Sequence, residues 1–303
     1  MVSEMDVFQR NERILKRNRI IHKILGQAAI WLVLVLMYIP IGVLIVYSFS
    51  ANDVIGGEVF NFSFIQYSRL FTDAEIMTAL GNTLILALAS SALSTILGTA
   101  GAIGAFYSKR RARSVIENVT QIPVVNAEIV IALSLTVMFV FVGTYIFAGA
   151  NLFSFWTLLI GHMILSLPFV YLSVKPKLIQ MDPALYEAAL DLGCTPNQAL
   201  WKTTMPEIAP GILSGFMLSI TLSLDDFIVS AFTRGAGLLS GDKTIDTLST
   251  LVQAKIKKGP IPPAMRALTT IIFIVVLLIV IGMTVYLNVM AKRVKKRAGR
   301  EAK

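Results

Sequence analysis

Six long apolar segments constrain this chain more than any other feature of its sequence. An apolar run of about 18 residues or more is typical of a membrane-spanning helix, and a soluble core needs no run of that length. Backbone polar groups must be satisfied within the bilayer, so helices are expected, and the alternation typical of a membrane barrel is absent. The predicted fold class is an all-α integral membrane protein with six transmembrane helices. These cover residues 24–49, 79–107, 122–147, 153–174, 208–232 and 267–290.

The composition agrees with a membrane protein and excludes several other classes. Hydrophobic residues make up 55% of the chain and charged residues 15%, against about 25% charged residues in soluble domains. The single cysteine, Cys194, excludes an internal disulfide and a cysteine-rich metal site. His22 and His162 have no second ligand at metal spacing, so no metal or cofactor is predicted. Each histidine is expected to pack or to form hydrogen bonds.

Lysine and arginine are distributed unequally between the connections. One set of connections holds 20 of the 27 basic residues, and by the positive-inside rule this set is cytoplasmic, together with both termini. The set comprises residues 1–23, 108–121, 175–207 and 291–303.

The net charge of +9 raises the question of nucleic acid binding. The basic runs at 109–113 and 292–297 abut predicted span ends, where they suit anionic lipid headgroups of the bilayer, so no nucleic acid partner is expected. The first apolar run is longer than that of a signal peptide and has no A-x-A-like site after it, so an uncleaved span is predicted. The predicted organisation is a cytoplasmic segment 1–23, a transmembrane domain 24–290 and a basic cytoplasmic tail 291–303.

The connection 175–207 carries the signals of a short helix that ends at a glycine. Asp182 followed by Pro183 indicates a helix start, because the Asp side chain accepts a first-turn N–H group and proline has no N–H group to leave unsatisfied. Gly193 is expected to end this helix, because glycine adopts the left-handed backbone conformation without steric penalty.

A second short helix is predicted to follow at once. Thr195, Pro196 and Gln198 match a capping box, in which two side chains satisfy backbone N–H groups reciprocally. Pro206 is predicted to close this helix, because proline removes a donor and clashes with the preceding turn. Two short helices with a sharp bend between them should therefore project from the cytoplasmic face.

The segment EAALDLGCTPNQALWKTTMP, residues 187–206, resembles the EAA loop of ABC importer permeases. The resemblance implies that this loop couples the chain to a separate ATP-hydrolysing subunit. The chain has no G-x-x-x-x-G-K-[ST] motif, so it is expected to be a transport subunit and not an enzyme. The positions that match the loop are Glu187, Ala188, Ala189, Gly193 and Pro206.

Three carboxylates lie inside predicted spans. Asp225 and Asp226 stand near the middle of 208–232, and Glu128 lies within 122–147. Ionisable residues at membrane depth are costly and therefore indicate a functional site. Neither span contains a lysine or arginine, so these acids suit a cationic cargo. Adjacent residues on a helix cannot face the same way, so one aspartate is open to a role in bonding a neighbouring helix instead.

The segment TLSLDDFIVSAF and the order of the six spans resemble the PotC-type permeases of spermidine/putrescine importers. The resemblance implies a type I ABC importer permease in a bacterial inner membrane, with Glu128, Asp225 and Asp226 on the polyamine path. It also implies three partners: a second homologous permease, a dimer of ATP-binding cassette ATPases, and an extracellular or periplasmic polyamine-binding protein.

The sequence leaves three other functions open. A permease of the same class could carry another small solute, such as an iron chelate, thiamine or a phosphonate. An ion-driven secondary transporter would use the same acids, but its uptake would collapse with the ion gradient. A membrane scaffold that transports nothing would show no ATPase stimulation by cargo.

Overall fold

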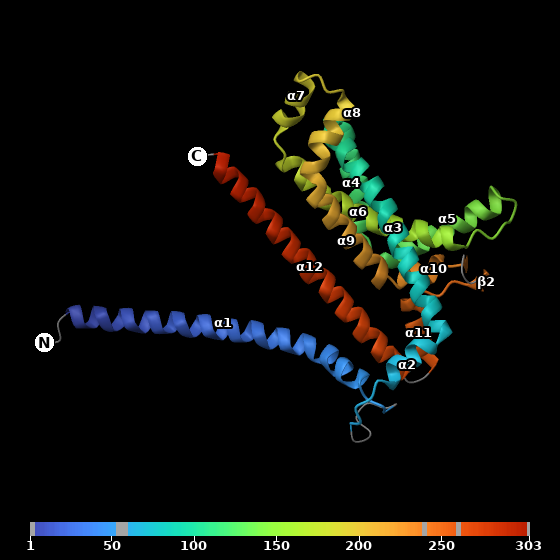
Figure 1. Cartoon of the computed structure of the whole chain (residues 1–303), viewed down its shortest axis with the longest axis horizontal. Helices are drawn as coiled ribbons and strands as arrows, with labels where there is room; N and C mark the ends of the chain where they lie inside the picture. The colour runs from blue at the N-terminus through green and yellow to red at the C-terminus, as the bar shows by residue number, and fades with distance from the viewer. Residues whose placement is uncertain (1–3, 53–59, 238–240, 259–261, 302–303) are drawn as a thin grey trace. The chain divides into compact units, whose positions relative to one another are not determined.

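The computed structural model describes residues 4–52, 60–237, 241–258 and 262–301 (Figure 1). The described part is predominantly helical, and its strands are confined to one short antiparallel hairpin. The elements are α1 (Glu4–Ser48), α2 (Ile65–Thr72), α3 (Ala74–Tyr107), α4 (Arg110–Val125), α5 (Glu128–Tyr145), α6 (Phe155–Gln180), α7 (Pro183–Asp191), α8 (Pro196–Ala199), η1 (Leu200–Thr204), α9 (Met205–Asp225), α10 (Ile228–Thr233), β1 (Ala236–Gly237), β2 (Gly241–Thr244), α11 (Leu248–Lys258) and α12 (Pro263–Glu301).

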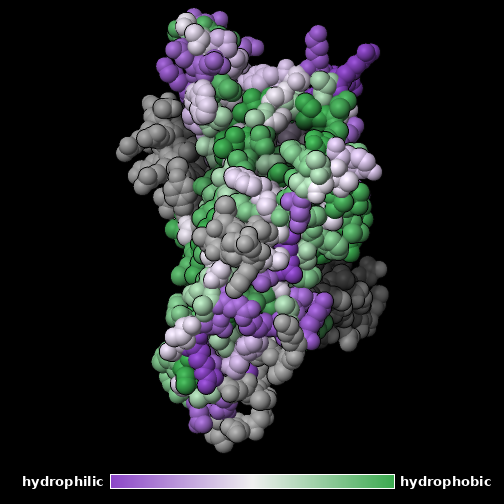
Figure 2. All heavy atoms as spheres, turned by 90° about the vertical axis from the view of Figure 1, so that its right-hand side faces the viewer, coloured by the Kyte–Doolittle hydropathy of each residue, from purple (hydrophilic) through white to green (hydrophobic). Residues whose placement is uncertain are grey.

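Six helical segments of the described residues are long and apolar enough to cross a membrane, which confirms the predicted number of spans. Hydrophobic side chains cover much of the middle of the face shown in Figure 2, and hydrophilic ones gather toward its two ends. The six segments are Lys23–Ser48, Ala74–Tyr107, Glu128–Tyr145, Phe155–Gln180, Pro196–Asp225 and Pro263–Gly282.

The chain divides into two units, Met1–Thr72 with Pro262–Lys303, and Asp73–Ile261. In the first unit α12 packs against α1 and α2. The buried side chain of Gln66 donates to the Ser50 carbonyl oxygen at 3.3 Å. These contacts fix α2 beside the end of α1.

The second unit is built on three mutually packed helices, α3, α6 and α9, which lie side by side in Figure 1. Small residues permit the close approach: a Cβ atom added at Gly98 would lie 2.9 Å from the Cβ atom of Val170. One added at Gly215 would lie 3.1 Å from the Cα atom of the same valine. Helices that approach through small residues gain dispersion contacts that lipid cannot supply. The buried cluster at this junction comprises Ala102, Ala105, Val170, Tyr171, Val174, Leu178 and Ile208.

The predicted span 122–147 is not one helix. α4 ends at Val125, and α5 begins at Glu128. Asn126 and Ala127 between them have extended backbone angles. The prediction of a single helix was wrong here because the apolar run conceals the break. Asn competes with helical bonding, and Pro123 already removes one donor from the last turn of α4. Glu128 therefore stands at a helix start and not within a helix.

Candidate functional site

The first short helix of the connection forms as its sequence predicts. The Asp182 carboxylate accepts the backbone N–H group of Ala184 at 3.0 Å, with Pro183 in the first turn of α7. Gly193 follows the helix with φ of 86°, a left-handed value that other residues adopt only under strain. The predicted cap and the predicted end are both confirmed.

The second short helix starts as predicted but does not end at Pro206. The Thr195 hydroxyl oxygen accepts the Gln198 N–H group, and the Gln198 side-chain oxygen accepts the Thr195 N–H group. Beyond α8, the π-helical turn η1 carries the chain directly into α9. The prediction for Pro206 was wrong because proline is tolerated equally well in the first turn of a helix, where its missing N–H group breaks no bond.

This segment, α7 to η1, exposes several apolar side chains among its polar ones. Leu192 is 86% exposed and Trp201 is 66% exposed. Among the matched positions Glu187 and Ala188 are exposed, whereas Ala189 is buried. Large exposed apolar side chains of this kind, tryptophan above all, are typical anchors of protein–protein interfaces.

A second break separates α9 from α10, and it corrects the predicted span 208–232. α9 ends at Asp225, and the chain turns at Asp226. The Asp226 carboxylate bonds the first turn of α10, since Oδ1 accepts the Val229 N–H group at 3.2 Å and Oδ2 accepts the Ser230 N–H group at 2.8 Å. The prediction that both aspartates lie near the middle of one helix was therefore wrong. They stand at its end, and the break follows from the side chain of Asp226.

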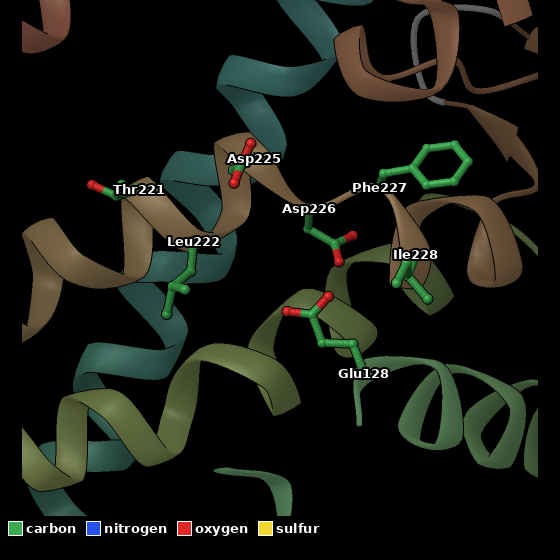
Figure 3. A pocket seen from close by; sticks show the side chains of 7 residues that line it. All are labelled: Glu128, Thr221, Leu222, Asp225, Asp226, Phe227 and Ile228. Carbon is green, nitrogen blue, oxygen red and sulfur yellow. The ribbon is translucent and has the colours of Figure 1, made fainter. Parts of the chain in front are cut away.

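Both breaks face a cavity of about 350 Å³ in the second unit (Figure 3). The three predicted acids all line it. Glu128 and Asp225 are exposed, whereas Asp226 is buried. Figure 3 shows the carboxylates of Glu128 and Asp226 pointing toward one another and that of Asp225 pointing away from both. None of the described lining residues is a lysine or arginine: they are Glu128, Thr221, Leu222, Asp225, Asp226, Phe227 and Ile228.

His162 is part of this site, which the sequence alone did not reveal. The imidazole is fully buried in α6 and bonds Ser223 and Ser230, as the hydrogen-bonding prediction allowed. Its Nε2 atom also lies 3.4 Å from Asp226 Oδ2. The only signal in the sequence is a histidine inside an apolar span, in a chain with several serines in its other spans. Nothing in the spacing indicates which of them meet.

Residues 95–298 match the family described as binding-protein-dependent transport system inner membrane component. The chain is 31% identical over 257 residues to the spermidine/putrescine transport system permease protein PotC of Haemophilus influenzae, covering 85% of this chain and 94% of that protein. It is 29% identical over 239 residues to the putrescine transport system permease protein PotI of Escherichia coli K12, covering 78% and 81%.

A solved structure has the same fold. A chain of a bacterial alginate ABC transporter, in complex with an alginate pentasaccharide-bound periplasmic protein, superposes with a TM-score of 0.64 at 18% identity. The match covers 93% of this chain and 97% of that one. At this identity the likeness shows the fold alone.

Proposed function

Because the chain belongs to the family of binding-protein-dependent transport system inner membrane components, we propose that it forms half of the path of a polyamine importer. The cargo is spermidine, putrescine or both. The observation that carries the proposal is the pair of exposed carboxylates, Glu128 and Asp225, on one cavity without a basic lining residue in the described chain. An extended polycation would be attracted there.

The identity of the cargo rests on charge and on the relatives together. Proteins at about 30% identity over most of this chain carry spermidine and putrescine in their names. The fold itself does not choose the cargo, since the structural neighbour handles alginate. Separate carboxylates also suit passage better than a tight cage, because a site that binds too strongly would trap its cargo.

The exposed surface from α7 to η1 supports the proposal that a separate ATP-hydrolysing subunit docks there. Its loop matches the coupling positions Glu187, Ala188, Ala189, Gly193 and Pro206, and it presents Leu192 and Trp201 to solvent. We assign this surface to docking on an ATP-binding cassette ATPase dimer. Both termini of the chain then lie in the cytoplasm, on the same side of the membrane as the ATPase. The basic segments 1–23 and 291–303 fit that orientation.

A second homologous permease would complete the path, and a periplasmic or extracellular polyamine-binding protein would deliver the cargo. The structurally similar alginate transporter was solved with a periplasmic protein that holds an alginate pentasaccharide. ATP binding and hydrolysis would shift the pair of permeases between outward-open and inward-open forms. The loop transmits the bias because it docks differently in the two states.

The test is uptake of radiolabelled spermidine and putrescine by the four-part complex in proteoliposomes. We expect uptake that requires ATP and the binding protein and that persists when ion gradients are dissipated. Uptake that follows an ion gradient without ATP would show a secondary transporter. ATP-dependent uptake of an iron chelate, thiamine or a phosphonate, with none of polyamines, would show another cargo. If polyamines are not taken up and do not stimulate ATPase activity, the chain would be a membrane scaffold that transports nothing.

A further inference from the structure

We propose that His162 is a positioning residue of the cation path, and that it holds Asp226 as a structural carboxylate, bonded to the protein and not to the cargo. The cargo would then meet Asp225 and Glu128 only. The cationic nature of the cargo rests on the proposed function, whereas the positioning itself does not depend on it.

The contacts of His162 run in both directions from the ring. Nδ1 lies 2.8 Å from Ser223 Oγ on α9, and Nε2 lies 2.9 Å from Ser230 Oγ on α10. Nε2 also lies 3.4 Å from Asp226 Oδ2. The ring therefore bridges two helices: Nδ1 contacts the end of α9, and Nε2 contacts α10.

The hydroxyl groups determine which nitrogen carries the proton. Ser230 Oγ donates to the Asp226 carbonyl oxygen, so it accepts from His162 Nε2–H. Ser223 Oγ accepts from Ser90 Oγ at 3.2 Å and is free to donate to His162 Nδ1. Donors and acceptors then follow one another from α3 to α10, and a neutral imidazole with its proton on Nε2 satisfies both serines. Nε2 also lies close to the Asp226 carboxylate, 3.4 Å from Oδ2.

Both carboxylate oxygens of Asp226 are engaged by the protein in this arrangement. Its two carboxylate oxygens accept two backbone N–H groups and lie against the imidazole, and only 1% of its side chain is exposed. Its carbonyl oxygen accepts from Ser249 Oγ on α11 at 2.7 Å. Exchanging these bonds for a passing cation would leave buried donors unpaired, which is costly. Asp225, the preceding residue, makes no comparable bond among the described contacts and is exposed.

Glutamine and asparagine at position 162 each replace one of the two ring nitrogens, so the two variants test the two contacts separately. Glutamine places its amide near the position of Nε2, and asparagine places its amide near the position of Nδ1. If the contact toward Ser230 and Asp226 positions the path, His162→Gln should keep at least half of the uptake rate, whereas His162→Asn and His162→Leu should lose about tenfold. The matched control is Ser166→Ala, one turn along α6, which deletes a buried hydroxyl that has no hydrogen-bond partner among the described residues. It should transport normally.

Double variants show whether His162 acts through Asp226. In the His162→Leu background, Asp226→Asn should lower uptake by clearly less than its own tenfold, because the part of that loss that comes from the imidazole contact is already gone, whereas the bonds to the Val229 and Ser230 N–H groups remain to be lost. Asp225→Asn should lower uptake in the His162→Leu background by the same factor as in the wild type, because Asp225 acts on the cargo directly. Full multiplication in both pairs, or loss in His162→Gln equal to that in His162→Leu, would overturn the positioning role.

A second readout needs no cargo at all. Val229 is fully buried, and its N–H group is held by Asp226 Oδ1. In a Cys194→Ser background, a Val229→Cys thiol in the purified complex should react with a water-soluble maleimide at least fivefold faster when His162 is leucine. The rate should not change with glutamine or with Ser166→Ala. Equal rates with histidine and leucine would overturn the inference. A wild-type complex without polyamine uptake would refute the proposed function, and the maleimide rates would still decide the role of His162.

Discussion

Two aspartates stand at breaks between helices, and their surroundings are opposite. Asp182 is exposed and caps α7 through the Ala184 N–H group, only two residues away. Asp226 is buried and bonds the first turn of α10, with His162 of another helix against it. The first break is a local property of consecutive residues and leaves a surface free for a partner. The second combines a similar local cap with a contact from another helix, and it shapes the wall of a cavity.

Disrupting the bend at Gly193, at the other end of α7 from Asp182, should have the largest effect, because it removes the docking geometry as a whole. Gly193 has φ of 86°, and a Cβ atom added there would meet no other atom within 4 Å, so backbone strain alone decides its replacement. Gly193→Val should abolish uptake and co-purification of the ATPase while the protein remains in the membrane. Gly193→Asn is the matched control, because asparagine tolerates this conformation, and it should retain the complex. A fully assembled, active valine variant would contradict the coupling role.

Asp226→Asn disrupts the buried break. An amide replaces one of the two oxygens that accept backbone N–H groups, and an unpaired buried donor costs about 1–3 kcal/mol. We expect uptake to fall about tenfold and the melting temperature of the purified protein to fall as well. Asp225→Asn is the control, since it should lower uptake without lowering the melting temperature. Equal melting temperatures for both variants would contradict the division of roles.

The cap of the exposed break should matter less. Asp182→Ala deletes the acceptor for the Ala184 N–H group, and loss of such a cap costs about 1 kcal/mol. ATPase stimulation should therefore fall about fivefold at most, because the Gly193 bend remains. Asp182→Asn keeps an acceptor and should be close to normal. A complete loss in the alanine variant would mean that the cap, and not the bend, determines docking.

The smallest effect concerns the ion pairs of Glu117, a carboxylate outside the six candidate spans. Glu117 Oε1 lies 2.9 Å from Lys175 Nζ and 2.9 Å from Arg113 Nε. The hydrogen bond from Lys175, then that from Arg113, lowers the pKa of Glu117 below its ordinary value. Since the folded-state pKa is depressed, the stabilisation is present above the unfolded-state pKa of about 4.3 and is lost as pH falls through the folded-state pKa.

Melting curves against pH check this pair. Glu117→Gln should destabilise the protein at pH 7 by no more than about 1 kcal/mol, as for other partly exposed pairs. The difference from the wild type should shrink below about pH 4.3. A difference that grows on acidification would show the opposite pKa shift. The loss of stability from this partly exposed pair is the reference value, and the loss from disrupting the buried network around Asp226 should be clearly larger.

The same contrast explains what the sequence could predict. The caps at Asp182 and Thr195 and the bend at Gly193 depend on neighbours within three residues, so the pattern alone was sufficient. The prediction for Pro206 was wrong because a proline can follow the end of one helix or stand in the first turn of the next, and the sequence pattern does not distinguish the two.

The breaks beside Glu128 and Asp226 were missed because the apolar runs around them outweigh the local signals of Asn126 and Asp226. Both lie within apolar runs that satisfy the criterion for one continuous span. At Asp226, the ring of His162 reinforces the turn from α6, far away in sequence, and the serines of its hydrogen-bond network come from three helices. The acids themselves were found because their charge is costly at membrane depth, whatever the local structure.

The most direct test of a cationic path is to delete the two exposed charges on the cavity. Asp225→Asn and Glu128→Gln nearly preserve shape, and Glu75→Gln is the control, a carboxylate of the same unit that pairs with Lys255 away from the lining residues. Radiolabelled polyamine uptake by the four-part complex should fall about tenfold or more in the double variant. That loss corresponds to about 1.4 kcal/mol, with assembly and the control unchanged. Near-normal uptake by the double variant would contradict the acidic path.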